Sequence, residues 1–459
     1  MADHNFDVVI LGGGSGGYAA ALRSAQLGKS VALIERDKIG GTCLHRGCIP
    51  TKALLHAAEV ADVTKEAGAF GVSATFNGID MGAVNKYRDG VVERLFKGLT
   101  GLVGSSKSIT VVAGEGHLVA PKTIKVGEDT YTGTNVVLAT GSYSRTLPGL
   151  EIGGRVITSE HALQLNFVPN SVIVLGGGVI GVEFASVWKS FGTQVTVVEG
   201  LPNLVPNEDP AVSKGLERAF RKRGIDFKTG VRFQGVTQDA NGVKVTMEDG
   251  TVFEAELMLV AVGRGPNTAG FGYEENGITI DRGFVITNDR LQTSVPGVYA
   301  AGDIVPGLQL AHRGFAQGIF IAEDIAGLNP AAIDESGIPK VTYSEPEIAS
   351  VGVTEAKAAE LYGAENISTY EYNLAGNGKS QILSTAGFVK LIRRNNGPVV
   401  GVHMIGSRVG EQIGEAQLIV NWEAYPEDVA SLIHAHPTMN EAIGEAHLAL
   451  AGKPLHAHA

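Results

Sequence analysis

The chain has 459 residues, of which 44% are hydrophobic and 19% charged, a composition typical of globular proteins, and at roughly 150 residues per domain it predicts about three domains. Lys and Arg number 37 and Asp and Glu number 48, and the net charge of −11 argues against a nucleic acid as the main partner. No apolar run is long enough to cross a bilayer and the first strand begins too early for a targeting peptide, so we expect a cytoplasmic protein.

The chain opens with a strand, a helix and a second strand, predicted at residues 6–11, 18–27 and 30–34. The first turn holds GxGxxG, made of Gly12, Gly14 and Gly17, and Glu35 follows the second strand roughly 20 residues further on. Glycines let the backbone approach a pyrophosphate, the helix N-terminus offers N–H donors, and the carboxylate accepts from ribose hydroxyls. This combination predicts a dinucleotide-binding unit.

The only two cysteines, Cys43 and Cys48, follow in GGTCLHRGCIPTK, residues 40–52. A disulfide closing so small a loop would contribute about 2 kcal/mol. A chain this long does not need one for stability, and zinc would require further ligands. Pro50 predicts the first turn of a helix, whose N-terminus would stabilise a thiolate at Cys48. We therefore interpret the cysteines as a redox pair, as expected in a reducing compartment.

The region after the cysteines predicts helices and then short strands. A helix runs from Pro50 to about Ala61, and a longer helix lies within residues 75–102. Residues 108–138 predict short strands with Gly and Asp turns. Residues 139–142 (ATGS) end a strand in a tight turn, which we interpret as the exit to a second domain.

A second unit of the same kind follows, with a strand, a helix and a strand predicted at residues 171–175, 182–191 and 194–198. Gly176, Gly178 and Gly181 form its GxGxxG, and Glu199 again follows roughly 20 residues further on. Two complete fingerprints predict two dinucleotide domains. Because Glu199 would repel a 2′-phosphate, NAD is favoured over NADP at the second site.

A helix near residues 210–223 and strands as far as residues 258–260 continue the second unit. Turn residues 261–268 close it. A later strand ends at Asp303, which could cap the following helix, residues 310–326, or accept from a ribityl or ribose hydroxyl. The residues alone leave both interpretations open.

From about Lys340 the pattern changes to an α+β domain without a third fingerprint. Strands are predicted at residues 367–373, 387–394 and 399–405, and helices at 410–422, 426–434 and onward from 441 to about 450. HAHPTMNE occupies residues 434–441. The tail, residues 456–459, is expected to be disordered, and we assign it no metal.

Taken together, these residues resemble the class I pyridine nucleotide–disulfide oxidoreductases over essentially the whole chain. GGGSGG, GGTCLHRGCIPTK, GGGVIGVE, AVGRGPNT, AAGD and HAHPTMNE carry the resemblance and occur in the expected order. The resemblance implies an α/β fold with two Rossmann-like dinucleotide-binding domains, for FAD and NAD, and a C-terminal α+β dimerisation domain. The implied divisions are an FAD-binding domain at 1–147, an NAD-binding domain at 148–268, a central FAD-binding segment at 269–338 and the dimerisation domain at 339–459.

The resemblance also implies the residues that bind each cofactor. Those implied for FAD are Gly12, Gly14, Gly17, Glu35, Thr42, Lys52, Gly116, Thr140, Gly141, Asp303 and the backbone near Ala311. Those implied for NAD are Gly176, Gly178, Gly181, Glu183, Glu199, Val231 and Gly263. Lys52 and Glu183 are expected to meet near the flavin, where their charges could tune its ring.

The catalytic residues are implied in the same way. Cys48 would face the flavin, Cys43 would face a thiol substrate, and His436, oriented by Glu441, would be the acid/base. Glu199, GCIP and HAHPT make the chain look most like family members that oxidise protein-bound dihydrolipoamide with NAD. These are homodimers in which His436 would reach the redox pair of the other subunit.

The implied partner is a lipoyl-bearing domain of a 2-oxoacid dehydrogenase-type complex, with no membrane and no nucleic acid. Two alternatives stay open at the level of the sequence. One is a related disulfide reductase that acts on a low-molecular-weight disulfide. The other is a non-catalytic, nucleotide-sensing flavoprotein, against which the cysteine pair and His436 argue because binding alone needs neither.

Overall fold

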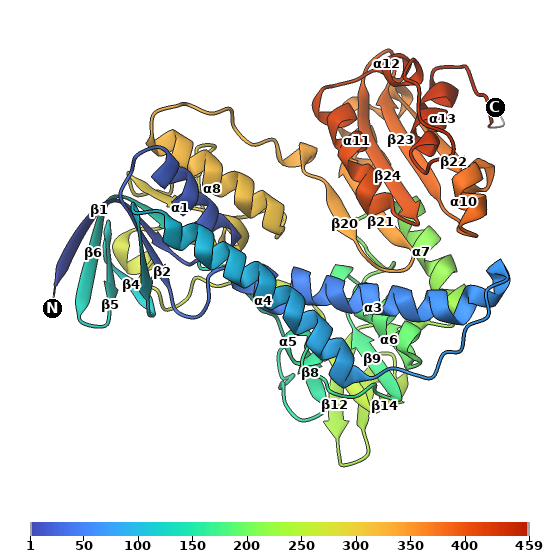
Figure 1. Ribbon diagram of the computed structural model, residues 1–459, viewed down its shortest axis with the longest axis horizontal. Helices are drawn as coiled ribbons and strands as arrows, with labels where there is room; N and C mark the ends of the chain where they lie inside the picture. The colour runs from blue at the N-terminus through green and yellow to red at the C-terminus, as the bar shows by residue number, and fades with distance from the viewer. Residues whose placement is uncertain (1, 457–459) are drawn as a thin grey trace.

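The computed structural model describes residues 2–456 of the chain. Its elements form three parts, each built around one large sheet (Figure 1). The first sheet lies at the N-terminal end of the molecule, the second below its middle, and the third on the C-terminal side. Among the described residues, no helix combines the length and apolar character that crossing a membrane requires.

The first sheet has seven strands in the order β3-β2-β1-β6-β5-β4, with β19 paired to β6. These strands are β1 (Asp3–Leu11), β2 (Val31–Glu35), β3 (Ile109–Ala113), β4 (Gly116–Ala120), β5 (Thr123–Val126), β6 (Asp129–Leu138) and β19 (Val298–Ala300). β1, β2, β3, β6 and β19 run parallel, whereas β4 and β5 extend the sheet by antiparallel pairing. Since β19 comes late in the chain, the backbone returns to the first sheet after building the second part.

Helices α1 (Ser15–Gln26) and α8 (Ala311–Ile325) pack against each other beside this sheet (Figure 1). A Cβ at Gly318 would lie 2.3 Å from the carbonyl oxygen of Gly16. Glycine at position 318 therefore lets the two helix backbones approach closely. The central strands are buried on both faces, as with Ile10 and Leu33, which explains their unbroken apolar runs.

The second sheet is parallel, in the order β11-β10-β9-β15-β8. Its strands are β8 (Val156–Thr158), β9 (Ser171–Leu175), β10 (Gln194–Val198), β11 (Asp226–Lys228) and β15 (Leu257–Val260). Its helices are α5 (Ser159–Ala162), α6 (Val179–Phe191) and α7 (Pro210–Arg223), and an antiparallel sheet is formed by β12 (Phe233–Gln238), β13 (Val243–Met247) and β14 (Val252–Ala255). β7 (Ser142–Ser144) and β16 (Arg264–Pro266) pair antiparallel where the chain enters and leaves this part.

The third sheet is antiparallel, in the order β20-β21-β24-β23-β22. Its strands are β20 (Lys340–Thr342), β21 (Glu347–Gly352), β22 (Ile367–Asn373), β23 (Phe388–Arg394) and β24 (Val399–Gly406). The helices of this part are α9 (Glu355–Tyr362), α10 (Gly378–Ile382), α11 (Val409–Asn421), α12 (Pro426–Ala430) and α13 (Glu441–Leu450). Buried side chains of β23, β24, α11 and α13 form one apolar core.

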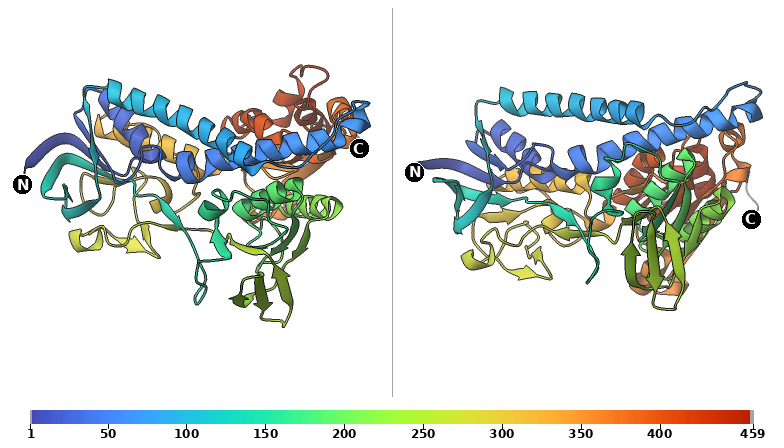
Figure 2. Two further views of the ribbon diagram at one scale, coloured as in Figure 1. Left: turned by 60° about the horizontal axis from the view of Figure 1, so that its bottom comes forward. Right: turned by 90° about the horizontal axis from the view of Figure 1, so that it is seen from below.

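Three further helices connect the parts: α2 (Gly41–Arg46), α3 (Cys48–Glu66) and α4 (Met81–Ser105). Figure 2 shows α3 and α4 running along one side of the molecule, and α3 packs against both α4 and α6. The remaining elements are η1 (Ala67–Phe70), η2 (Glu274–Asn276), η3 (Gly302–Ile304), η4 (Glu335–Gly337), η5 (Ala364–Asn366), η6 (Leu374–Gly376), β17 (Ile280–Asp281) and β18 (Phe284–Val285).

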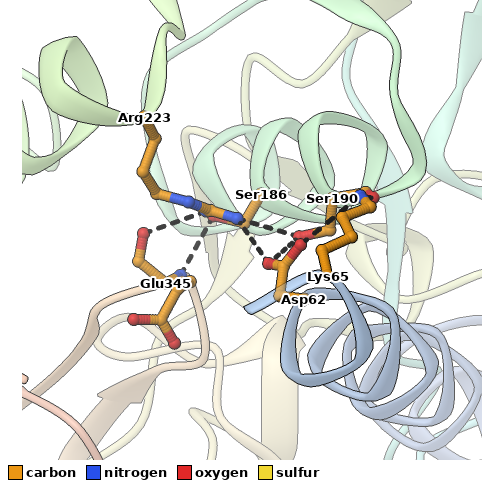
Figure 3. A network of polar contacts seen from close by, with 6 residues as sticks. All are labelled: Asp62, Lys65, Ser186, Ser190, Arg223 and Glu345. Carbon is orange, nitrogen blue, oxygen red and sulfur yellow. Dashed lines mark hydrogen bonds and ion pairs between the residues drawn. The ribbon is translucent and has the colours of Figure 1, made fainter. Parts of the chain in front are cut away.

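A polar network joins α3, α6 and α7 to the C-terminal part (Figure 3). Asp62 of α3 accepts hydrogen bonds from Ser190 Oγ of α6 at 2.5 Å and from Arg223 of α7 at 2.9 Å. Arg223 also donates to the carbonyl oxygen of Glu345 at 3.2 Å. The N–H of Glu345 donates to Ser186 Oγ at 3.0 Å. One network therefore joins the connecting helix α3 to the second part and to the C-terminal part.

Most predicted elements are confirmed, and β9, β10 and α7 have the predicted bounds. The helix predicted at residues 426–434 is wrong in length because it ends at Ala430, and His434 turns toward Glu415 of α11 instead of continuing it. β20, β21 and α9 were not predicted. Pro50 is the third residue of α3, so the helix begins earlier than its position suggested, at Cys48.

The structure also decides against one interpretation that the sequence left open and corrects one smaller prediction. Asp303 does not cap α8, whose N-cap residue is Leu310 and carries no side-chain cap; Asp303 lies in η3. His456 was expected to be disordered, but its N–H and Nδ1 both bond to the carboxylate of Glu445, at 3.0 and 2.8 Å. Residues 457–459 of the tail lie outside the described residues.

Candidate active site

The two cysteines lie at the junction of α2 and α3. Cys43 belongs to α2, and Cys48 is the first residue of the 19-residue helix α3. Both are partly buried free thiols. The partial positive charge at the N-terminus of α3 favours a thiolate at Cys48.

One hydrogen bond makes the two thiols unequal. Because the Cys43 thiol donates to the Cys48 thiolate, it lowers the pKa of Cys48 to about 7; burial opposes this shift and Lys52 assists it. The same bond raises the pKa of Cys43, and burial acts in the same direction. Cys48 is therefore the sulfur that ionises first, while Cys43 retains its proton.

Lys52, one turn into α3, forms the contact with Glu183 of α6 that the resemblance implied. Its Nζ lies 2.9 Å from each carboxylate oxygen of Glu183, which is buried. The N–H of Tyr343 donates to the same carboxylate at 2.9 Å, and Lys52 Nζ lies 4.8 Å from the centre of the Tyr343 ring. Burial alone would lower the pKa of Lys52, but Glu183 outweighs it and the net shift is upward. A fixed positive charge is thus placed close to Cys48.

A cavity of about 300 Å³ lies at the carboxyl ends of β1 and β2. Seven of the residues implied for FAD line it: Gly12, Gly14, Glu35, Thr42, Gly116, Thr140 and Gly141. A Cβ built on Gly14 would find no protein atom closer than 4.0 Å. The fingerprint loop therefore faces open space large enough for backbone approach to a pyrophosphate, which fits a dinucleotide.

Four residues implied for FAD do not line this cavity: Gly17, Lys52, Asp303 and Ala311. Gly17 acts within the loop, since a Cβ there would lie 1.8 Å from the carbonyl oxygen of Gly12. Ala311 begins α8, where the absence of a side-chain cap leaves backbone N–H donors at the helix N-terminus.

Asp303 is held by residues that the sequence analysis did not single out. Its carboxylate accepts from Ser142 Oγ. Ser142 Oγ in turn accepts from Arg264 Nε at 2.7 Å. Arg264 belongs to the AVGRGPNT motif and Ser142 to the ATGS turn, but neither pattern predicted a contact with Asp303.

The two fingerprint acids have the same geometry in both units. Glu35 accepts from the N–H of Gly13 at 2.7 Å, and Glu199 accepts from the N–H of Gly177 at 2.6 Å. The second oxygen of each accepts from the N–H two residues later, at 2.8 and 2.7 Å. Each carboxylate therefore closes its own glycine loop and keeps lone pairs that could accept from a ribose.

The remaining residues implied for NAD gather at the same end of the second sheet. Gly176 has φ 108°, and a Cβ at Gly181 would lie 1.9 Å from its carbonyl oxygen. No protein atom lies within 4 Å of a Cβ built on Gly178 or Gly263. The N–H of Val231 donates to the carbonyl oxygen of Glu199. The open loop and the fixed carboxylate fit a dinucleotide here as well.

His436 and Glu441 form a dyad at the start of α13. His436 Nδ1 lies 2.7 Å from Glu441 Oε1, and the N–H of Thr438 donates to Oε2 at 2.7 Å. The side chain of His436 is 75% exposed. α13 is well separated from the start of α3 in Figure 1, so one chain does not bring its own dyad to its own cysteines.

Comparisons with known proteins agree with this geometry. Residues 6–318 match the family described as pyridine nucleotide-disulphide oxidoreductase, and residues 338–447 match its dimerisation domain. The chain is 42% identical to a dihydrolipoyl dehydrogenase of Bacillus subtilis (strain 168) over 98% of its length and 99% of the relative. It is 39% identical to a mitochondrial dihydrolipoyl dehydrogenase of Pisum sativum, over 99% and 93%, and 39% identical to a leghemoglobin reductase of Glycine max, over 100% and 89%.

Solved structures show the same fold. LpdA from Mycobacterium tuberculosis superimposes with a TM-score of 0.89 at 28% identity, covering 98% of this chain and 100% of that one. The flavoprotein disulfide reductase RclA from Escherichia coli gives a TM-score of 0.88 at 26% identity, covering 97% and 100%. The fold class and the family that the motifs predicted are both confirmed. The chain belongs to the pyridine nucleotide-disulphide oxidoreductase family.

Proposed function

We propose that this chain is an FAD-dependent dihydrolipoyl dehydrogenase, which oxidises protein-bound dihydrolipoamide to lipoamide and reduces NAD⁺. One observation carries the proposal: the Cys43–Cys48 pair at the start of α3 lies beside the Lys52–Glu183 contact, which joins the two nucleotide units. Several relatives with this name are 37–42% identical over nearly the full chain.

The nucleotides are FAD at the first fingerprint and NAD at the second. Glu35 and Glu199 are the ribose acceptors, and the glycine loops and the N-termini of α1 and α6 receive the pyrophosphates. Bound at this site, FAD would supply two-electron transfer between the dithiol and NAD. Lys52 places positive charge beside Cys48, with Glu183 fixing its position.

The thiol chemistry follows from the two unequal cysteines. His436 removes a proton from a substrate thiol, and the thiolate attacks the sulfur of Cys43 in the oxidised pair. The Cys43–Cys48 bond breaks, and Cys48 leaves as a thiolate. The second substrate sulfur then attacks the substrate sulfur bound to Cys43, so the lipoamide disulfide forms and the bond to Cys43 breaks. Cys43 leaves with the proton held by the imidazolium, and the proton of the second substrate thiol passes to the freed imidazole of His436 and from there to solvent. The product has a Cys43 thiol that can donate to the Cys48 thiolate, a state favoured by the lowered pKa of Cys48 and the raised pKa of Cys43.

The site is completed by a second copy of the chain. The match of residues 338–447 to a dimerisation domain supports a homodimer. Since α13 lies far from the start of α3 within one chain, His436 acts on the cysteine pair of the partner subunit.

We extend the proposal to a lipoyl-bearing domain of a 2-oxoacid dehydrogenase-type complex as the substrate carrier, and to a cytoplasmic location. The divisions at residues 147, 268 and 338 stay predictions. No observation favours the low-molecular-weight disulfide or the non-catalytic alternative.

The proposal is tested with Cys48→Ser. The purified wild-type protein should carry FAD and reduce NAD⁺ when given dihydrolipoamide, followed by NADH absorbance. Cys48→Ser should retain the flavin spectrum but lose thiol-dependent NAD⁺ reduction, because the internal disulfide cannot form. Full turnover by this variant, or a wild-type protein inert toward dihydrolipoamide, would contradict the proposal.

A further inference from the structure

The loop that carries His436, residues 434–440, is attached at both ends to a single carboxylate. Glu415 of α11 accepts from His434 Nε2 at 2.7 Å through one oxygen. Its other oxygen accepts from Asn440 Nδ2 at 2.6 Å. Neither Glu415 nor its two partners belongs to the His436–Glu441 dyad, and the pattern of the sequence did not mark Glu415.

Further contacts hold the loop against the C-terminal core. A Cβ at Gly444 would lie 2.5 Å from His434 Nδ1, so glycine there leaves room for the His434 ring to lie against α13. Met439 is buried in the apolar core, and Asn377 donates to the carbonyl oxygen of Thr438 at 3.0 Å. Only the tip of the loop, residues 435–437, is exposed. His436 therefore lies at the exposed tip of a loop whose two ends both bond to Glu415.

Carboxylates and imidazoles alternate in this cluster. The hydrogen bond from Glu415 raises the pKa of His434, against the opposing effect of burial. Burial would raise the pKa of Glu441, but the Thr438 N–H, His436 and His434 together lower it. A protonated His434 thus helps to keep Glu441 ionised, which is the form that orients His436 through Nδ1.

We propose that Glu415 is a positioning residue for the thiol half of the reaction, because it fixes both ends of the loop that presents the His436–Glu441 dyad to the partner subunit. The inference rests on the proposed function. Glu415 acts through His434 and Asn440, which its two carboxylate oxygens hold. Misplacing a catalytic base by about 1 Å costs on the order of a hundredfold in rate.

The test compares two half-reactions of the FAD-loaded dimer by stopped-flow absorbance of the flavin: reduction by dihydrolipoamide and reduction by NADH. Glu415→Gln keeps the side-chain volume but has one accepting oxygen for two donors, and we expect roughly a tenfold loss in the dihydrolipoamide rate. Glu415→Ala removes both bonds and should lose roughly a hundredfold. The NADH rate should stay within about twofold, and in steady state kcat should fall with little change in KM for dihydrolipoamide.

Glu411→Gln, an exposed acid one turn earlier on α11, is the matched control and should behave as wild type. If Glu415→Ala does not assemble, Glu415→Gln and His434→Gln decide the question. An equal loss of rate in both half-reactions would mean that Glu415 has a merely structural role, and this would overturn the inference. The inference would also be overturned if Glu415→Gln and His434→Gln were reduced by dihydrolipoamide at the wild-type rate while His436→Gln was slow. A wild-type protein that dihydrolipoamide does not reduce would instead refute the proposed function.

Discussion

At the scale of single residues, a hydrogen bond between the two cysteine sulfurs gives two identical side chains different pKa values. Cys48 has the helix N-terminus, Lys52 and the Cys43 thiol in its surroundings, so its negative charge is stabilised more than burial destabilises it. At Cys43 the hydrogen bond to Cys48 and burial raise the pKa by more than Lys52 and the Cys48 N–H lower it, so Cys43 keeps its proton. The order of ionisation is therefore set by position in the fold rather than by residue type.

This difference predicts a pH titration. In the reduced protein, Cys48 should change from thiol to thiolate with a midpoint near pH 7, below its ordinary value of 9.0, so the thiolate is present above pH 7 and lost below it. Because the chain has only two cysteines, selective ¹³C labelling of their Cβ atoms gives two resonances to follow by NMR. Cys43→Ala should move the remaining midpoint upward, since the donating thiol is gone; an unchanged midpoint would show that the sulfur–sulfur bond is not its cause.

A second prediction concerns His436. Replacing it in His436→Gln removes a general base that the Glu441 carboxylate orients at 2.7 Å, and such a loss costs about 10² to 10⁴-fold in rate. The measurement is dihydrolipoamide-dependent NAD⁺ reduction. Electron transfer from NADH to a dye that takes electrons from the flavin is the control and should be retained. A variant with normal thiol turnover would remove His436 from the site.

At the scale of elements, the two strand–loop–helix units repeat the same solution. In each, the last fingerprint glycine passes so close to the first that no Cβ fits, and the acid at the end of the next strand accepts two backbone N–H bonds from its own unit. The glycine loops that precede α1 and α6 are therefore held in place before any ligand binds. Preorganised donors reduce the ordering cost of binding.

The repetition allows a paired prediction. Gly17→Ala places a Cβ 1.8 Å from the Gly12 carbonyl oxygen and should abolish FAD retention, measured by the flavin absorbance of the purified protein. Gly181→Ala creates the same clash, at 1.9 Å from the Gly176 carbonyl oxygen, but in the second unit. That variant should keep its flavin and lose NAD binding, measured by calorimetry. Loss of flavin in Gly181→Ala with NAD binding intact would reverse the assignment of the two sites.

At the scale of the whole molecule, buried ion pairs tie the second part to the third. Lys390 of β23 donates to Asp209, the N-cap residue of α7, at 2.8 Å, and to Glu355 at 2.6 Å. Asp209 is fully buried. Burial would raise its pKa, but Lys390 and two backbone N–H donors lower it overall. This pairing therefore stabilises the fold above the ordinary carboxyl range near pH 4 and is lost as the pH falls through the lowered pKa.

The corresponding prediction is a loss of stability in Lys390→Met. Removing the ammonium leaves the Asp209 carboxylate buried without a cation, which costs about 3–5 kcal/mol in free energy of unfolding. Urea unfolding of the FAD-loaded dimer at pH 7 measures it. Lys357→Met, which breaks the exposed Lys357–Glu360 pair, is the control and should change stability by less than about 1 kcal/mol. Equal midpoints for both variants would contradict the role of the buried pair.

Local patterns were enough to predict most of the elements and both glycine loops. Apolar runs located β9 and β10 to the residue, and the fingerprints located the turns that follow β1 and β9, because strand burial and turn chemistry act between near neighbours. The failures lie where distant residues intervene. The helix after Pro426 ends at Ala430, and His434 beyond it bonds to Glu415 of α11. Asp303, for which the sequence left two roles open, is bonded by Ser142.

The amino-acid sequence by itself determined the family, the two nucleotide units and the cysteine pair, since each depends on a compact motif of residue types at short spacing. Only the tertiary structure decided which other side chains meet across the chain, such as Arg223 with Asp62, 161 residues apart, and Lys390 with Asp209, 181 residues apart. It also decided that Cys43 donates to Cys48 and so keeps its proton, and that Glu415 holds both ends of the His436 loop. Such contacts depend on how helices and sheets pack, and no local periodicity records that packing.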